Sequence, residues 1–161
     1  MKRAHQFRKH LRHKGHDYSS NGFYFITICC KKFKPLFGEV DDGIMILNNF
    51  GVVADQQWQA LPKRFSQVCC HVHQIMPNHM HGILEIHNTT VAKPQLGQII
   101  GAYKSLTYKH CRELSNTAPL RKLWQPNYYE HVIRNEKAYE KISQYIETNP
   151  AQWDKDTYYI K

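Results

Sequence analysis

Residues 68–86 read V-C-C-H-V-H-Q-I-M-P-N-H-M-H-G-I-L-E-I, in which two strand-forming runs flank a Pro-Asn dipeptide. A dipeptide of this kind between two such runs is typical of a tight turn. The stretch therefore predicts an antiparallel hairpin with strands over 68–76 and 79–86.

Two histidines open the second strand of this hairpin. Side chains alternate between the two faces of a strand, so His79 and His81 should point the same way while Met80 points into the core. Two imidazoles on one face can bind a metal ion and leave coordination positions open for water or phosphate oxygens. His71 and His73 form the same pattern on the first strand, and alternation alone does not rank either pair above the other.

The rest of the chain predicts an α+β domain built on this hairpin. Apolar spacing and turn residues predict, in chain order, a strand over 22–30, a hairpin over 40–47, helices over 49–61 and 95–114, a strand over 128–133 and a helix over 136–149. Pro62 and Pro150 are expected to end the first and last of these helices. This order of elements favours an antiparallel sheet covered by helices over alternating βα units.

The chain is strongly basic and about one domain long. Its 161 residues hold 22 Lys and Arg against 13 Asp and Glu, which gives a formal charge of +9 and a pI of about 9.3. We interpret residues 1–16 as a basic arm that precedes a single domain over 17–161. The arm holds no acid and six cationic side chains: Lys2, Arg3, Arg8, Lys9, Arg12 and Lys14. This charge predicts a polyanionic partner whose phosphates the arm contacts.

The apolar runs and the cysteines of the sequence indicate the cellular location of the protein and the redox state of its thiols. No run approaches the roughly 18 residues of a membrane span, and the N-terminus does not resemble a signal peptide, so we expect a cytoplasmic protein without a membrane partner. The five cysteines include the neighbours Cys29-Cys30 and Cys69-Cys70, whose side chains should point to opposite faces of a strand. We expect reduced thiols, and the lack of any C-x-x-C spacing argues against a structural zinc site.

Several short motifs occur in an order that is typical of one family. They are G-H-D-Y at 15–18, F-I-T at 25–27, M-P-N-H-M-H-G-I at 76–83, W-Q at 124–125 before a Tyr-Tyr strand, I-R-N-E at 133–136 and Y-I-E-T-N-P at 145–150. Together they resemble the single-tyrosine HUH transposases. The resemblance is greatest to the REP-associated tyrosine transposases, which are related to those of the smallest bacterial insertion sequences.

The resemblance implies a ferredoxin-like antiparallel β-sheet flanked by α-helices, and it implies roles for four residues. It places the metal-binding HUH motif on His79 and His81, makes Tyr145 the nucleophile, and makes Asn149 a third metal ligand. The spacing is compatible, since residues four apart share a helix face. The implied reaction cleaves and rejoins single-stranded or hairpin DNA through a 5′-phosphotyrosine, with Mg²⁺ or Mn²⁺ and no nucleotide cofactor. Both a monomer and a homodimer are compatible with the family.

Two other functions are open at this point. One is a non-catalytic nucleic-acid-binding domain of the same fold. The other is a zinc-dependent hydrolase built on four histidines, His71, His73, His79 and His81, with Glu85 as the candidate base on that face. Three further tyrosines rival Tyr145 as the nucleophile, namely Tyr128, Tyr129 and Tyr139.

Overall fold

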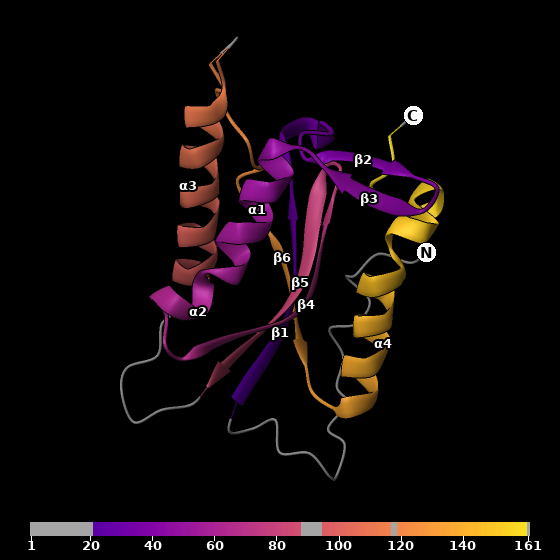
Figure 1. The fold of residues 1–161 in the computed structure, drawn as a ribbon. Coiled ribbons are helices and arrows are strands. Elements are labelled where there is room, and N and C mark those ends of the chain that lie inside the picture. The colour runs from indigo at the N-terminus through magenta and orange to yellow at the C-terminus, as the bar shows by residue number, and fades with distance from the viewer. Residues whose placement is uncertain (1–20, 88–94, 117–118, 161) are drawn as a thin grey trace.

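The computed structural model describes residues 21–87, 95–116 and 119–160 (Figure 1). Its main sheet has the strand order β4-β5-β1-β6 and is formed by β1 (Asn21–Cys29), β4 (Val68–Met76), β5 (His79–His87) and β6 (Tyr129–Ile133). A separate hairpin is formed by β2 (Gly38–Asp41) and β3 (Ile44–Leu47). The helices are α1 (Asn49–Gln59), α2 (Leu61–Arg64), α3 (Leu96–Leu114) and α4 (Glu136–Thr148).

The connections between these elements give the ferredoxin-like arrangement. All neighbouring strands of the main sheet are antiparallel, and the two β-α-β units, β1–α1–β4 and β5–α3–β6, interleave so that β5 and β1 are central. Helices α1 and α3 cover one face of the sheet and α4 covers the other (Figure 1). The predicted α+β fold, an antiparallel sheet flanked by helices, is confirmed.

The larger core lies between the sheet and α1 and α3. Met80 and Leu84 of β5 are fully buried there, together with Trp58 of α1 and Tyr103 of α3. Each such side chain contributes on the order of 1.5–3 kcal/mol when it leaves water. On the opposite face a smaller core of Ile83, Ile133 and Ile146 joins the sheet to α4. Strand β5 is therefore buried on both faces over most of its length, so His79 and His81 lie inside the protein.

A β-bulge divides β4 and changes which face its histidines occupy. Cys69 pairs with Glu85, but His73 pairs with Gly82, so the register shifts by one residue between the two pairs. An extra residue in one strand reverses the alternation of the side chains that follow it. Cys69 and His71 therefore lie on the α4 face, and His73 lies on the α1 face.

The structure corrects two predicted effects of proline. Pro62 does not end the helical region, because it lies in the first turn of α2, where a missing backbone N–H breaks no hydrogen bond. Asn149 keeps helical backbone angles (φ −58°, ψ −42°) although Pro150 follows it, and a 3-10 helix continues over Pro150–Lys155. The chain thus keeps turning after α4, and its C-terminal segment returns towards the sheet.

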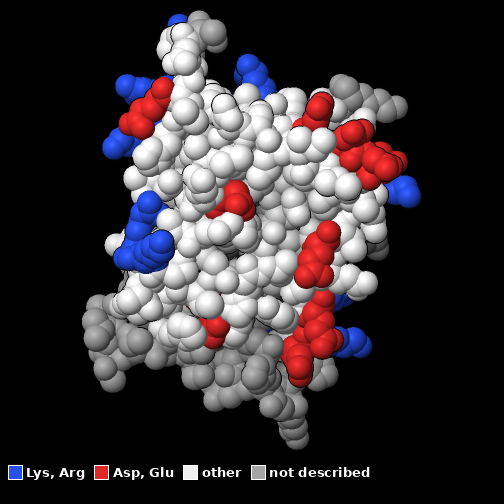
Figure 2. All heavy atoms as spheres, viewed as in Figure 1, with Lys and Arg blue, Asp and Glu red and all other residues white. Residues whose placement is uncertain are grey.

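The positive charge of the chain is concentrated near its N-terminus. The predicted basic arm, with Lys2, Arg3, Arg8, Lys9, Arg12 and Lys14, lies outside the described residues. The first 20 residues hold six of the 22 Lys and Arg and one of the 13 Asp and Glu, and so carry five of the nine excess positive charges. On the face in Figure 2, acidic side chains gather on the α4 side and a group of basic ones lies on the α3 side.

None of the described helices is long and apolar enough to cross a membrane. All five cysteines lie within the described ranges and are free thiols, as predicted.

Candidate active site

His79 and His81 lie side by side at the start of β5 and are almost completely buried. Their Nε2 atoms are 3.0 Å apart. His79 Nδ1 donates to Asn78 Oδ1 at 2.8 Å, and the Asn78 amide is oriented by its own donation to the carbonyl oxygens of Phe33 and Tyr158. A neutral His79 therefore presents an unprotonated Nε2 to the neighbouring ring.

The second imidazole is positioned by β1. Thr27 pairs with His81 across the sheet, and its Oγ1 lies 2.7 Å from His81 Nδ1. Burial lowers the pKa of His79 to about 3. Burial also holds the pKa of His81 well below its ordinary value, and the neighbouring His79 adds to this effect. Both rings are neutral near pH 7, which is the form that ligates a metal ion.

Tyr145 reaches the histidine pair from α4. Its hydroxyl oxygen lies 3.3 Å from His81 Nε2, and its ring packs edge-on against Phe25. Burial raises the pKa of Tyr145, and the nearby negative charge of Asp156 raises it further. The hydroxyl is therefore protonated at neutral pH.

Asn149 lies one helical turn beyond Tyr145 and is also buried. Its Nδ2 donates to Asp156 Oδ2 at 2.5 Å, and Asp156 Oδ1 accepts from the backbone N–H of Tyr158 at 2.7 Å. Asn149 Oδ1 is buried and has no hydrogen-bond partner in the part of the chain that the structure describes. The Asn149 side chain is close enough to His79 to offset part of the lowering of its pKa. An unpartnered amide oxygen at this position is suited to a cation.

Two residues of the site were not singled out from the sequence, Asp156 and Tyr158. A carboxylate oxygen of Asp156 and one ring nitrogen from each of His79 and His81 all lie within 4.8 Å of one another. The Tyr158 ring packs against the His79 ring in a tilted arrangement, with the ring centroids 4.6 Å apart. The signal for Asp156 was weak, since the sequence shows only that an acid follows Asn149 by seven residues. The donor set of two imidazoles, a carboxylate and an amide oxygen fits a divalent cation.

The three rival tyrosines lie in other surroundings. Tyr139 bonds His71 Nδ1 at 2.9 Å, away from the HUH pair. Tyr129 pairs with Thr27 and so shares the face of the HUH histidines, but its side chain is 46% exposed. Tyr128 packs against the core on the α1 and α3 side. Among the predicted candidates, Tyr145 is the tyrosine that contacts an HUH histidine.

The four-histidine zinc hydrolase is wrong, because the histidines do not converge. The bulge in β4 places His73 on the α1 face, where its Nε2 bonds Asp55 Oδ1 at 2.7 Å. His71 stays on the α4 face, where it contacts Glu85 and Tyr139. Two histidines on opposite faces of a sheet cannot ligate one ion.

A cavity of about 440 Å³ opens next to the HUH histidines. Its wall is formed by the segment before and at the start of β6, including Asn127, Tyr128 and Tyr129, and by Cys29 of β1. Cys29 pairs with His79 in the sheet, so the cavity and the candidate metal site are neighbours. An aromatic wall of this kind is suited to stack a nucleobase.

The buried histidines predict that the metal-free protein loses stability in mild acid. Because the folded-state pKa of His79 is about 3 and the ordinary value is 6.5, the unfolded chain binds a proton first as the pH falls. The free energy of unfolding that depends on this neutral imidazole is therefore fully present above pH 6.5, and it is lost as the pH falls towards 3. Each of His79 and His81 contributes up to about 1.4 kcal/mol per pH unit. Urea unfolding in metal-free buffer between pH 7 and 5 measures this slope.

The variant His79→Gln removes one of these titrations, so its stability should depend less steeply on pH. The matched control is His110→Gln on the surface of α3, whose ring is partly exposed, so the comparison separates the effect of a buried imidazole from the loss of any histidine. A wild-type stability that stays level between pH 6.5 and 5 would contradict the burial of two neutral imidazoles.

Comparison with known proteins places the chain among the transposases. The sequence model of the family described as "Transposase IS200 like" matches residues 58–149, which is more than half of the chain and includes His79, His81, Tyr145 and Asn149. The chain belongs to the IS200-like transposase family, in agreement with the resemblance of its motifs.

One relative and two solved structures extend this result. An uncharacterized protein of Haemophilus influenzae is 39% identical over 171 residues, which covers 95% of this chain and 93% of that protein. A REP-associated tyrosine transposase, solved bound to a REP hairpin, matches with a TM-score of 0.63 and 19% identity over 89% of this chain and 74% of its own. A candidate transposase from Deinococcus radiodurans matches with a TM-score of 0.50 and 18% identity over 84% of this chain and 95% of its own. At these identities the structural matches show a shared fold.

Proposed function

We propose that this transposase cuts and rejoins single-stranded DNA through a covalent 5′-phosphotyrosine, with Tyr145 as the nucleophile and a divalent metal ion at His79 and His81. The observation that carries the proposal is the meeting of these three side chains. Tyr145 Oη lies 3.3 Å from His81 Nε2, which lies 3.0 Å from His79 Nε2, although Tyr145 and His81 are 64 residues apart.

The residues around the pair supply further ligands for the ion. Asn149 offers its buried Oδ1, while Asp156 holds the other end of the same amide. A set of nitrogen and oxygen donors suits Mn²⁺, and Mg²⁺ suits the oxygen donors together with a phosphate. When bound, either ion stabilises the charge that develops on the non-bridging oxygens of the scissile phosphate.

Tyr145 carries the covalent step. Its phenol oxygen forms a bond to the phosphorus while the bond from phosphorus to the 3′-oxygen breaks, and the phenol proton is lost as the departing oxygen gains one. The products are a 5′-phosphotyrosine and a free 3′-hydroxyl. Attack of another 3′-hydroxyl on the phosphotyrosine reverses the step and joins the strands, so no nucleotide cofactor is needed. Because the pKa of Tyr145 is raised, its phenol depends on activation of the phosphate.

Entry of the phosphate requires some movement of α4 or of the Tyr145 side chain. The hydroxyl contacts His81 directly, so the two groups have to separate before a phosphate lies between them. Helix α4 is joined to the sheet by a core that has three buried isoleucines, Ile83, Ile133 and Ile146, with only partly buried hydrophobic side chains around them, and that is smaller than the core on the α1 and α3 side. A helix held by few buried contacts opens at a lower free-energy cost than the main core.

The DNA would lie over the face of the sheet on which His79, His81 and Tyr145 meet. A single strand suits the site because its phosphate can approach in line and its bases can stack in the cavity beside Tyr129. We infer that the arm over 1–16 contacts phosphates and that residues 17–161 form the catalytic domain. The solved REP-associated transposase is bound to a REP hairpin, which supports a hairpin with a single-stranded flank as the substrate. A homodimer is compatible with this proposal.

The test is incubation of the purified chain with a labelled oligonucleotide that forms a hairpin with a single-stranded flank. In the presence of Mn²⁺ or Mg²⁺ we expect a covalent protein–DNA band on a denaturing gel and a fragment with a free 3′-hydroxyl. Chelation by EDTA should remove both products. A blunt duplex without a flank is the control substrate and should give neither.

A non-catalytic DNA-binding domain predicts a different outcome. It would retard the hairpin on a native gel and form no covalent band with any metal ion or flank. That result would overturn the proposed reaction and leave the DNA-binding part of the proposal standing.

A further inference from the structure

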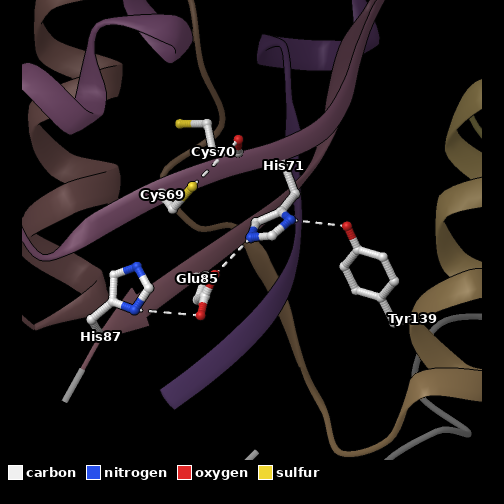
Figure 3. Close-up of polar contacts among 6 residues, drawn as sticks. All are labelled: Cys69, Cys70, His71, Glu85, His87 and Tyr139. Carbon is white, nitrogen blue, oxygen red and sulfur yellow. Dashed lines mark hydrogen bonds and ion pairs between the residues drawn. The ribbon is translucent and has the colours of Figure 1, made fainter.

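A second group of metal-ligand side chains lies on the same face of the sheet as His79 and His81, but near the other end of β5. Its members are Cys69 and His71 of β4 and Glu85 of β5 (Figure 3). Cys69 Sγ, a ring nitrogen of His71 and a carboxylate oxygen of Glu85 all lie within 4.8 Å of one another. The group shares no residue with the candidate active site.

The sheet brings these donors together from different parts of the sequence. Cys69 pairs directly with Glu85, so their side chains project from the same face, and His71 follows Cys69 by two residues. The neighbouring thiol of Cys70 points to the opposite face, where its Sγ lies 3.3 Å from the carbonyl oxygen of Trp58. The bulge begins after Cys70, and it is the reason that the next histidine along β4 leaves the group.

The contacts within the group hold the donor atoms together through a hydrogen bond whose proton a cation would replace. His71 Nε2 lies 2.9 Å from Glu85 Oε2, and His87 Nδ1 lies 3.4 Å from Glu85 Oε1 (Figure 3). Glu85 is 8% exposed, so its carboxylate is largely removed from water and depends on positively polarised partners. Cys69 Sγ is 3.9 Å from the nearest hydrogen-bonding carbonyl, that of Cys70, which is a long contact.

We propose that Cys69, His71 and Glu85 form a zinc site that is separate from the catalytic metal site. Thiolate, imidazole and carboxylate are the ligand types that Zn²⁺ takes in proteins, and a sulfur donor discriminates against Mg²⁺. His71 ligates through Nε2, which faces Glu85. Three protein ligands leave a fourth tetrahedral position for water. The C-x-x-C spacing used to search for zinc sites misses this one, because its ligands pair across two strands.

The groups around the three ligands have the form of a supporting shell. His71 Nδ1 lies 2.9 Å from Tyr139 Oη, and a metal-bound imidazole commonly donates its other N–H to such an oxygen. On the other side of the group, His87 Nδ1 lies 3.4 Å from the second carboxylate oxygen of Glu85 and helps to orient it. Tyr139 belongs to α4 and precedes Tyr145 by six residues. Zinc at this site would therefore stabilise the packing of α4, the helix that carries the candidate nucleophile, against the sheet.

Cobalt substitution of the reduced, metal-free full chain tests the proposal. Co²⁺ bound to a thiolate absorbs strongly in the near ultraviolet, and Co²⁺ bound to histidines and carboxylates alone lacks this absorption. We expect the band to disappear when Zn²⁺ is added, and to saturate at one equivalent per chain in His79→Ala, where the candidate catalytic site lacks a ligand. Cys69→Ser should abolish the band, and His71→Gln should weaken Co²⁺ binding at least about tenfold.

Two controls make the result specific. Cys70→Ser changes the adjacent thiol on the opposite face and should keep the full band. His79→Ala removes a candidate catalytic ligand and should also keep it, so this test and the DNA-cleavage test fail independently of each other. Thermal unfolding in a His79→Ala background, where the candidate catalytic site lacks a ligand, gives a second measurement: Zn²⁺ should raise the midpoint of His79→Ala and of His79→Ala with Cys70→Ser, but not that of His79→Ala with Cys69→Ser. A wild type without the band, or a band that persists in Cys69→Ser, would overturn the zinc site.

Discussion

Replacement of Tyr145 by phenylalanine is expected to abolish the covalent protein–DNA band. The substitution removes the oxygen that would bond to the phosphate and keeps the ring that packs against Phe25 and His81. Loss of a nucleophile typically lowers the rate of the catalysed reaction by at least about 10³-fold. The remaining product would be too little to detect on a gel. The fold should persist, since one lost hydrogen bond costs about 1 kcal/mol.

Two neighbouring tyrosines provide matched controls for this result. Tyr158 is the stricter one, because its ring contacts the rings of both His79 and His81 and because burial raises its pKa as well. Tyr158→Phe and Tyr139→Phe should both keep the covalent band. Mass spectrometry of the protease-digested adduct should find the DNA on the peptide that contains Tyr145. An adduct that persists in Tyr145→Phe would exclude this residue as the nucleophile and direct attention to Tyr158.

Replacement of His81 by alanine is expected to have the second largest effect. His81 contacts both His79 and Tyr145, so its loss removes a proposed metal ligand and the group that lies against the proposed nucleophile. Even the loss of a residue that only supports a ligand lowers metal affinity or activity by about 10–100-fold. We therefore expect a loss of at least about 100-fold in the rate of adduct formation, measured over a titration of Mn²⁺.

The control for this variant is His73→Gln on the opposite face of the sheet. Its hydrogen bond to Asp55 lies away from the site, and glutamine retains a donor for that carboxylate, so the rate should change little. Binding of the hairpin, measured by fluorescence anisotropy in EDTA, should be similar for His81→Ala and the wild type. If His81→Ala formed the adduct at the wild-type rate across the titration, the assignment of the HUH pair as the metal site would be wrong.

Local periodicity accounts for the parts of the site that could be predicted from the sequence. Alternation along a strand places His79 and His81 on one face, and the structure has their Nε2 atoms 3.0 Å apart. Helical spacing places Asn149 one turn after Tyr145, and both side chains lie at the site. These relations hold because each depends on residues that are close in the chain.

The choice between the two H-x-H pairs could not be made in this way. Alternation treats His71 and His73 like the HUH pair, and the resemblance to a family was needed to rank them. The structure gives the physical reason, which is the bulge in β4 that sends His73 to the other face. A bulge is a property of two paired strands, so the sequence of one strand does not reveal it.

The contacts that could not be predicted from the sequence join residues that are far apart in the chain. Thr27 contacts His81 because β1 and β5 pair in one register out of many. Asp156 and Tyr158 reach the site because the chain keeps turning through Asn149 and Pro150 where the sequence predicted a clear end. The group of Cys69, His71 and Glu85 was missed for the same reason, since it is built across a strand pair.

The sequence by itself determined the elements of this transposase and the two half-sites that they carry, an H-x-H on a strand and a tyrosine with an asparagine on a helix. Backbone sterics and apolar periodicity act over a few residues, so these features can be read locally. Only the tertiary structure decided which histidines meet Tyr145, which carboxylate holds Asn149, and that Cys69, His71 and Glu85 come together on the α4 face. Those contacts depend on strand register and on the packing of a helix against a sheet, which bring together residues that are far apart in the chain.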